Sequence, residues 1–248
     1  MGARQQLDAG SPRRGPDGRS TRWAAHRAAR REQLIDAALA VLEEDGPDFG
    51  LQQVASRAGV TKPVIYRHFG ERAALVEAMG DRATNLLMSR LMPALFAETA
   101  LLTRIRMTIE AFLGFIDESP KIYRFFVRRA PLEGRDLAGV DKEFVAEALT
   151  SVLREYLHGF DPGSDRLAAV WARGAVGFVQ NAAEWWLESR AMTRDELAED
   201  LAMLLWVQID GIARRHGIAL DPEQPVTVEG VVARLDRDGR PRHIRSSS

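Results

Sequence analysis

The side chains best suited to bind a polyanion lie within one short stretch of the chain. They carry hydroxyl, ammonium, phenol, guanidinium and imidazole groups: Thr61, Lys62, Tyr66, Arg67 and His68. On the outer face of one helix, such groups donate hydrogen bonds to base edges in the major groove and to phosphates. The N-terminus of that helix also favours a phosphate. This segment therefore predicts a helix that reads duplex DNA.

The remaining reactive residues form no catalytic or metal-binding pattern. The chain has no Cys. It has His at positions 26, 68, 158, 216 and 243, and no two of these form a His-x-x-x-His pair. There is no G-x-G-x-x-G, no P-loop and no G-x-S-x-G sequence. We therefore expect no enzyme activity, no cofactor and no metal site.

Positive charge is concentrated near the N-terminus. Residues 1–31 contain eight Arg and two Asp, a net charge of +6, whereas the whole chain carries −1. Such asymmetry predicts a polyanion partner at the basic end, although a solvated arm would have the same composition. No run approaches 18 apolar residues, and the basic N-terminus does not resemble a secretory signal. We expect a cytoplasmic protein that does not associate with membranes.

Hydrophobic periodicity predicts an all-α fold. Apolar residues recur at three- and four-residue spacing in helices expected near 23–44, 51–58, 61–68, 71–91, 98–117, 120–129, 141–158, 164–190 and 193–215. Pro93 should break or kink its helix, and Thr193 with Glu196 forms a capping box. Residues 226–234 are strand-like, and Asp238-Gly239 is a possible turn.

These elements suggest four parts of the chain. They are a disordered basic arm (1–22), a helix-turn-helix DNA-binding domain (23–70), a helical regulatory and dimerisation domain (71–217) and a flexible tail (218–248). The second part contains two short helices joined by Ala58-Gly59-Val60-Thr61, a turn that lets helices cross steeply. The small core between them would be formed by Val54, Ala55, Val60 and Ile65.

This segment resembles the TetR family of bacterial transcriptional repressors. The resembling residues are Val54-Ala55, Ala58-Gly59-Val60-Thr61, Ile65-Tyr66-Arg67-His68-Phe69, Arg72, Leu75 and Val76. The motif covers about residues 28–76. Beyond residue 80, only the size, the helical pattern and the helix order match. The resemblance implies an N-terminal DNA-binding domain and a C-terminal helical domain for ligand binding and dimerisation.

The resemblance also implies where DNA is contacted. The recognition-helix contacts fall on Lys62, Pro63, Val64, Tyr66 and His68, of which the last two mostly hold phosphates in the family. Gln52, with Gln53 beside it, falls where the second helix often contacts DNA, and Arg72 matches a phosphate contact. The chain departs from the family at Gly50-Leu51, where Thr or Ser commonly caps the second helix. The Arg-rich arm is expected to replace that lost phosphate contact.

In the body of the protein, the resemblance implies a ligand pocket between the middle helices. The candidate ligand-binding residues are Arg104, Met107, Phe112, Phe115, Phe126, Trp171 and Phe178. Further polar candidates are Arg128, Gln180 and Asn181. Without the resemblance, the aromatic residues would be assigned to an ordinary core. The body is expected to bind a small, largely apolar molecule.

The last two helices, 164–190 and 193–215, are expected to form a homodimer interface. Its apolar residues would include Leu197, Leu201, Leu204, Leu205 and Trp206. The sequence thus predicts a homodimeric repressor that binds a double-stranded operator and is released by an apolar effector. Two alternatives remain open: a DNA-binding regulator controlled by a protein partner or by no ligand, and a helical enzyme.

Overall fold

The computed structural model describes residues 18–129, 137–157, 164–215, 218–223, 233–235 and 241–243. Its helices are α1 (Gly18–Asp45), α2 (Leu51–Arg57), α3 (Lys62–Phe69), α4 (Arg72–Leu95), α5 (Leu101–Glu118), α6 (Pro120–Arg124), the π-helical turn η1 (Phe125–Arg129), α7 (Leu137–Leu157), α8 (Ser164–Ser189) and α9 (Arg194–Arg215). The predicted all-α class, with a helix-turn-helix unit followed by a helical domain, is confirmed.

The N-terminal unit packs α2 and α3 against the C-terminal half of α1. Leu34 and Leu42 of α1, Val54 of α2 and Ile65 of α3 are almost fully buried in one core. Between α2 and α3, Gly59 has a φ of +64°, a conformation that side chains with a Cβ rarely adopt. This turn sets the steep crossing of the two short helices, as the sequence predicts.

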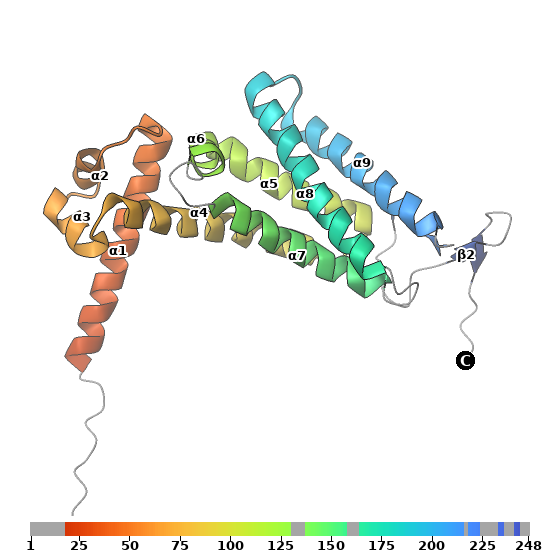
Figure 1. Ribbon diagram of the computed structural model, residues 1–248, viewed down its shortest axis with the longest axis horizontal. Coiled ribbons are helices and arrows are strands. Elements are labelled where there is room, and N and C mark those ends of the chain that lie inside the picture. Colours follow the sequence, from red (N-terminus) through yellow and green to blue (C-terminus); the bar gives the residue numbers. More distant parts are fainter. Residues whose placement is uncertain are drawn as a thin grey trace, which may run out of the picture.

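Helix α4 joins the two units without interruption (Figure 1). Its first half contributes Leu75 and Met79 to the N-terminal core, and its second half packs along α5. The prediction that Pro93 would break or kink this helix is wrong about the break, because α4 continues to Leu95. Pro93 lies in the last turn, where its missing N–H removes one of the final backbone hydrogen bonds and leaves the earlier turns intact.

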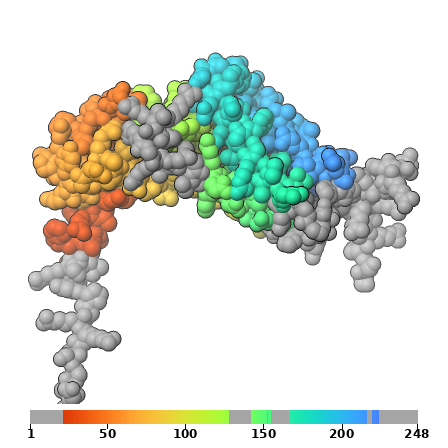
Figure 2. Space-filling model, viewed as in Figure 1, coloured from red at the N-terminus to blue at the C-terminus, as the bar shows by residue number. Residues whose placement is uncertain are grey.

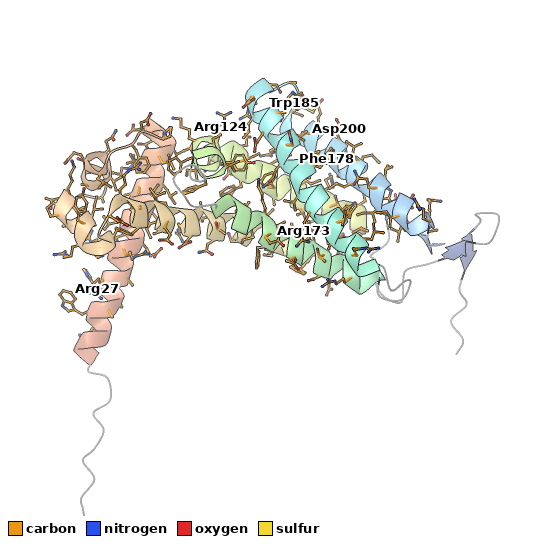
Figure 3. The ribbon with its side chains drawn as sticks, in the orientation of Figure 1. Arg27, Arg124, Arg173, Phe178, Trp185 and Asp200 are labelled. Atoms are coloured by element: carbon orange, nitrogen blue, oxygen red, sulfur yellow. The ribbon has the colours of Figure 1, made fainter. Side chains whose placement is uncertain are left out.

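The body consists of a group of three helices and a helix pair. Helix α5 packs between α4 and α9, and α7 packs along α8. Leu113, Ile116 and Trp186 are buried at the centre of this core. On the surface, Arg173 of α8 forms ion pairs with Glu143 and Glu147 of α7, and these pairs join the two helices (Figure 3).

The structure differs from the sequence prediction in several places. Helix α1 begins at Gly18, so residues 18–22, expected in a disordered arm, are helical. The predicted helix 120–129 changes to π-helical at Phe125. Three short strands, β1 (Ile218–Ala219), β2 (Ala233–Leu235) and β3 (Pro241–His243), pair antiparallel in that order.

Several predictions lie outside the described residues. The basic arm before Gly18 and the possible turn at Asp238-Gly239 are among them, as is most of the strand-like segment 226–234. Where the structure describes the chain, none of its helices is long and apolar enough to cross a membrane.

Candidate nucleic-acid interface and ligand cavity

Helix α3 separates a buried face from an exposed face. Ile65 and Phe69 point into the N-terminal core, which leaves the other side of the helix open to solvent. The exposed residues of this helix and its N-cap are Thr61, Lys62, Pro63, Tyr66 and Arg67, while Val64 and His68 are half-buried. The predicted donors therefore lie on one accessible surface. The hydroxyl of Thr61 makes no capping hydrogen bond to α3.

Helix α2 uses one of its two predicted DNA-binding residues as a cap. The Oε1 atom of Gln53 accepts a hydrogen bond from the Gly50 N–H at 2.6 Å, and its Nε2 donates to Asp45 at 2.9 Å. The Gln53 side chain thus caps the backbone N–H of Gly50, a role that the sequence analysis missed, while Gly50 has no side chain to accept from the first turn of α2. The three-residue spacing of Gly50 and Gln53 was the available signal. Gln52 is exposed.

Positive charge from three helices gathers at the C-terminal end of α3. The guanidinium of Arg31 in α1 lies 5.0 Å from the centre of the Phe69 ring, and that of Arg72 in α4 lies 5.0 Å from the Phe49 ring. The pKa of His68 is lowered by burial and then by Arg67, Arg27, Arg30 and Arg31. This end of the helix is therefore electropositive, as a phosphate-binding surface requires.

The body contains a cavity of about 130 Å³ between its helices. Its walls are mostly apolar side chains of α4, α5, α7, α8 and α9, including Leu91, Ile109, Leu149 and Val179. Four polar groups also line it: Arg104, Thr108, Lys142 and Gln180. An apolar cavity with a few polar groups is typical of a small-molecule site.

The predicted ligand-binding residues divide into two groups. Arg104, Phe112 and Trp171 line the cavity, and so does Gln180. The structure places the others elsewhere. Met107, Phe178 and Asn181 are exposed, Phe115 lies beneath the guanidinium of Arg90, and Phe126 is buried in the N-terminal core. The side chain of Arg128 is outside the described residues. Lys142 and the α7 wall were not predicted.

Aromatic side chains connect the cavity to the N-terminal core. The ring of Phe112, in the cavity wall, lies 6.0 Å from that of Tyr123 in α6. Two residues after Tyr123, the centre of the Phe125 ring lies 5.1 Å from that of Phe126 and 6.2 Å from that of Phe49, in the turn before α2. The rings of Phe125 and Phe126 belong to the same buried cluster as α1, α2 and α3.

Hydrogen bonds reinforce this contact between the two units. The carboxylate of Glu43 in α1 accepts a hydrogen bond from the Ile122 N–H at 3.0 Å and one from the Lys121 N–H at 3.5 Å, which caps α6. The Lys121 ammonium donates to the Glu44 carbonyl at 2.8 Å. These hydrogen bonds join helix α6 to the end of α1.

Comparison with known proteins agrees with this architecture. A family model described as bacterial regulatory proteins of the tetR family matches residues 34–79. A second, described as a tetracyclin repressor-like C-terminal domain, matches residues 90–219, more than half of the chain. The chain belongs to the TetR family. The resemblance identified from residues 28–76 is therefore confirmed.

Particular members of the TetR family are similar over most of their length. The transcriptional activator FasR of Mycolicibacterium smegmatis is 30% identical over 185 residues, which cover 73% of this chain and 83% of FasR. A TetR-family regulator from Streptomyces coelicolor has a TM-score of 0.62 at 24% identity, over 77% of this chain and 86% of that one. FadR from Bacillus subtilis, in complex with stearoyl-CoA, has a TM-score of 0.57 at 18% identity, and the match covers 70% of this chain and 96% of FadR. The two structures show the common fold.

In this TetR-family chain, α8 and α9 expose an apolar surface that we call the α8/α9 face. Its large residues are Leu167, Val170, Phe178 and Trp185 of α8 with Met203, Leu204 and Val207 of α9. Figures 2 and 3 show α8 and α9 at the surface of the body, and Figure 3 labels Phe178 and Trp185 there. Four of the predicted interface residues are instead buried within the protomer: Leu197, Leu201, Leu205 and Trp206.

The reason for this error is the packing of α9 on α5. The buried side of α9 faces α5, so Leu201 and Leu205 complete the core of their own protomer. Leu204 points to the other side and is 50% exposed. Of the five predicted interface residues, only Leu204 is available to a partner.

Proposed function

We propose that this TetR-family regulator is a homodimeric repressor whose affinity for operator DNA falls when a small, largely apolar ligand binds in the body. The cavity between α4, α5, α7, α8 and α9 is the observation that carries the proposal. A regulator controlled by a protein partner or by no ligand needs no such space. The protein would act in the cytoplasm, where it can reach its operator.

The cavity walls also favour a chemical class of ligand. Arg104 and Lys142 contribute two cations, and the described lining residues include neither Asp nor Glu. An apolar molecule with an acidic group would match this arrangement, because the acid would meet a positive charge inside a mostly apolar wall. The similar fold of FadR, which was crystallised with stearoyl-CoA, is consistent with such a ligand.

The size of the cavity suggests how binding could be transmitted. A cavity of about 130 Å³ is close to the roughly 150 Å³ that accepts benzene, and most ligand pockets are at least about 300 Å³. A larger ligand must therefore displace the walls. Phe112 contacts Tyr123 of α6, and α6 is fixed to α1 through Glu43, while α4 enters the DNA-binding unit directly. Displacement of these helices would change the spacing of the two recognition helices.

For DNA binding, we propose that Lys62 reads a base and that Tyr66, His68 and Arg72 hold phosphates. Thr61, Pro63, Val64, Arg67 and Gln52 would complete the contact surface, and Gln53 would mainly support α2. The residues 23–70 would form the DNA-binding domain and 71–217 the regulatory domain. In a dimer, half-sites must be about one helical turn apart, or a multiple of that, for both α3 helices to dock.

The homodimer would use the α8/α9 face. Its exposed apolar side chains flank Gly174 and Gly177, whose missing side chains would let a second helix approach closely. A contiguous apolar surface of this kind usually marks an interaction site. The pairing of α8 and α9 with their copies would place the two DNA-binding units on one side of the dimer.

The experiment that tests the proposal has two steps. Fatty acids, acyl thioesters, aromatic acids and hydrophobic drugs are first screened for an increase in Tm. Each stabilising compound is then titrated against protein bound to an operator selected from a random duplex library. We expect coupling of about 1–3 kcal/mol between ligand and DNA. If every stabilising compound left operator affinity unchanged, the ligand-responsive function would be refuted and control by a partner would be favoured.

A second candidate function is transcriptional activation, because the relative FasR is named an activator. The two functions differ in the effect of the bound protein on a promoter. A reporter gene placed downstream of the selected operator distinguishes them, since deletion of the regulator raises expression for a repressor and lowers it for an activator.

A further inference from the structure

The first half of α1 extends beyond the DNA-binding unit. The core of that unit begins at Leu34, although α1 begins at Gly18. From Arg22 to Gln33, every side chain is exposed except that of Arg30, which is half-buried. Figure 1 shows this segment projecting past α3, and Figure 3 labels Arg27 on it. Residues 18–33 span about 24 Å at 1.5 Å per residue.

The side chains of this segment are sorted by charge. One face carries, at three- and four-residue spacing, Arg22, Trp23, His26, Arg27 and Arg30. We call this set the α1 stripe. The opposite face carries Ala25, Ala28 and Glu32. Three arginines therefore share one side of the helix.

The α1 stripe is continuous with the DNA-binding surface of α3. Arg31, which follows the last residue of the stripe, has its guanidinium 5.0 Å from the centre of the Phe69 ring. Arg27 and Arg30 are close enough to His68 to help lower its pKa. A duplex docked on α3 would therefore pass next to the end of the stripe that carries Arg27 and Arg30.

We propose that the α1 stripe is a second DNA-binding element, which holds the sugar-phosphate backbone just outside the half-site read by α3. The proposal rests on DNA binding by α3. Arginines bind phosphates with release of counterions, and this contact is independent of base sequence. Trp23 is 75% exposed, so its ring can lie against a sugar while its indole N–H donates to a phosphate.

The length of the segment sets the reach of the contact. At about 3.4 Å per base pair, a helix of about 24 Å extends over at most about seven base pairs. The protein should therefore protect DNA outside both half-sites of a palindromic operator. A minimal operator that ends at the half-sites would lose these contacts and keep those of α3.

The test compares two duplexes that contain the same selected operator. The short duplex ends at the outer edge of each half-site, and the long duplex has eight additional mixed-sequence base pairs on each side. Affinities of the full-length wild type are measured by fluorescence anisotropy over a range of salt concentrations. We expect the long duplex to bind at least about tenfold more tightly at 0.1 M salt. Loss of two phosphate contacts per protomer corresponds to a change of about 3–4 in the log–log salt slope.

Two double variants distinguish the α1 stripe from net charge. Arg22→Ala/Arg27→Ala should reduce the long-to-short affinity ratio to about one. Because Arg27 also lies close enough to His68 to act on its pKa, the affinity for the short duplex should fall as well, but by a smaller factor than that for the long duplex. The matched control, Arg106→Ala/Arg194→Ala, removes the same charge from exposed positions on the body and should keep the wild-type ratio. Circular dichroism of both variants checks that the helix content is unchanged.

The possible failures are distinguishable. If the wild type bound no selected operator, DNA binding itself would be refuted. If the wild type bound both duplexes equally, or if the control lost the preference for the long duplex as much as the stripe variant did, the α1 stripe would not be a flanking-DNA element. Binding of the wild type, but not the stripe variant, to anionic phospholipid vesicles, with equal affinity for both duplexes, would assign the stripe to a membrane surface instead.

Discussion

Filling the cavity should stabilise the protein and abolish its response to ligand. Ala175 of α8 is 5% exposed and lines the cavity, so its replacement by Leu directs new carbon atoms into empty space. At about 24 cal/mol per Å³, elimination of a cavity of about 130 Å³ is worth at most about 3 kcal/mol. Three added carbon atoms at about 0.8 kcal/mol each give a similar limit. After some strain, we expect Ala175→Leu to raise the free energy of unfolding by about 1–2 kcal/mol.

The control for this variant is Ala198→Leu. Ala198 of α9 is fully buried but lies outside the cavity lining, so the same added atoms meet packed side chains. We expect it to destabilise by about 1–3 kcal/mol. Urea unfolding measures both changes, and operator titration with a stabilising ligand measures the response. If Ala175→Leu destabilised the protein as much as the control and retained ligand response, the cavity would not be the ligand site.

Four further results are expected. Leu204→Glu/Val207→Glu should yield monomers in sedimentation, and an unchanged dimer would place the interface outside the α8/α9 face. Lys62→Ala should reduce the free energy of binding to the preferred operator by about 1–3 kcal/mol and weaken the base preference at one position of the operator, whereas Arg72→Ala should weaken binding to all DNA sequences equally. If both variants lost affinity in the same way across sequences, these roles would be contradicted. The wild type on its operator should show a log–log salt slope near −5 or steeper, for roughly six or more phosphate contacts, and a slope between zero and −1 would contradict docking through phosphates. Burial and nearby arginines lower the pKa of His68 in the free protein, and a bound phosphate should raise it again. The affinity for DNA should therefore rise as the pH falls below the pKa of His68 in the complex, and level off below its pKa in the free protein, with about a tenfold gain for each unit between the two pKa values. His68→Gln should flatten this pH profile.

The DNA-binding unit could be predicted well because its structure depends on local sequence. Gly59 requires a left-handed conformation, Ala55 must be small where α2 meets α3, and Ile65 and Phe69 fix the buried side of α3. Each of these signals lies within a few residues of the turn. The long packing contacts of the body carry no such local signature.

The body shows where periodicity reaches its limit. Helix α8 has apolar residues on two sides: Trp171 faces the cavity, whereas Phe178 and Trp185 face solvent. A three- and four-residue spacing identifies both stripes as apolar but does not say which one meets its own core. The same ambiguity misassigned Leu201 and Leu205 to the interface, because α9 is apolar toward α5 as well as toward solvent.

The contact between α6 and α1 joins residues that are far apart in the sequence, and the proposed mechanism depends on it. Glu43 and Ile122 are 79 positions apart, yet their hydrogen bond fixes the cavity side of the molecule to the DNA-binding side. Phe125 and Phe126 then insert into a core otherwise built from α1, α2, α3, α4 and Phe49 in the turn before α2. Under the proposed function, a ligand that displaced Phe112 would act on this core through α6 and on α3 through α4. Both connections end in the same buried core, so we expect a displacement of the cavity wall to move the recognition helix together with that core.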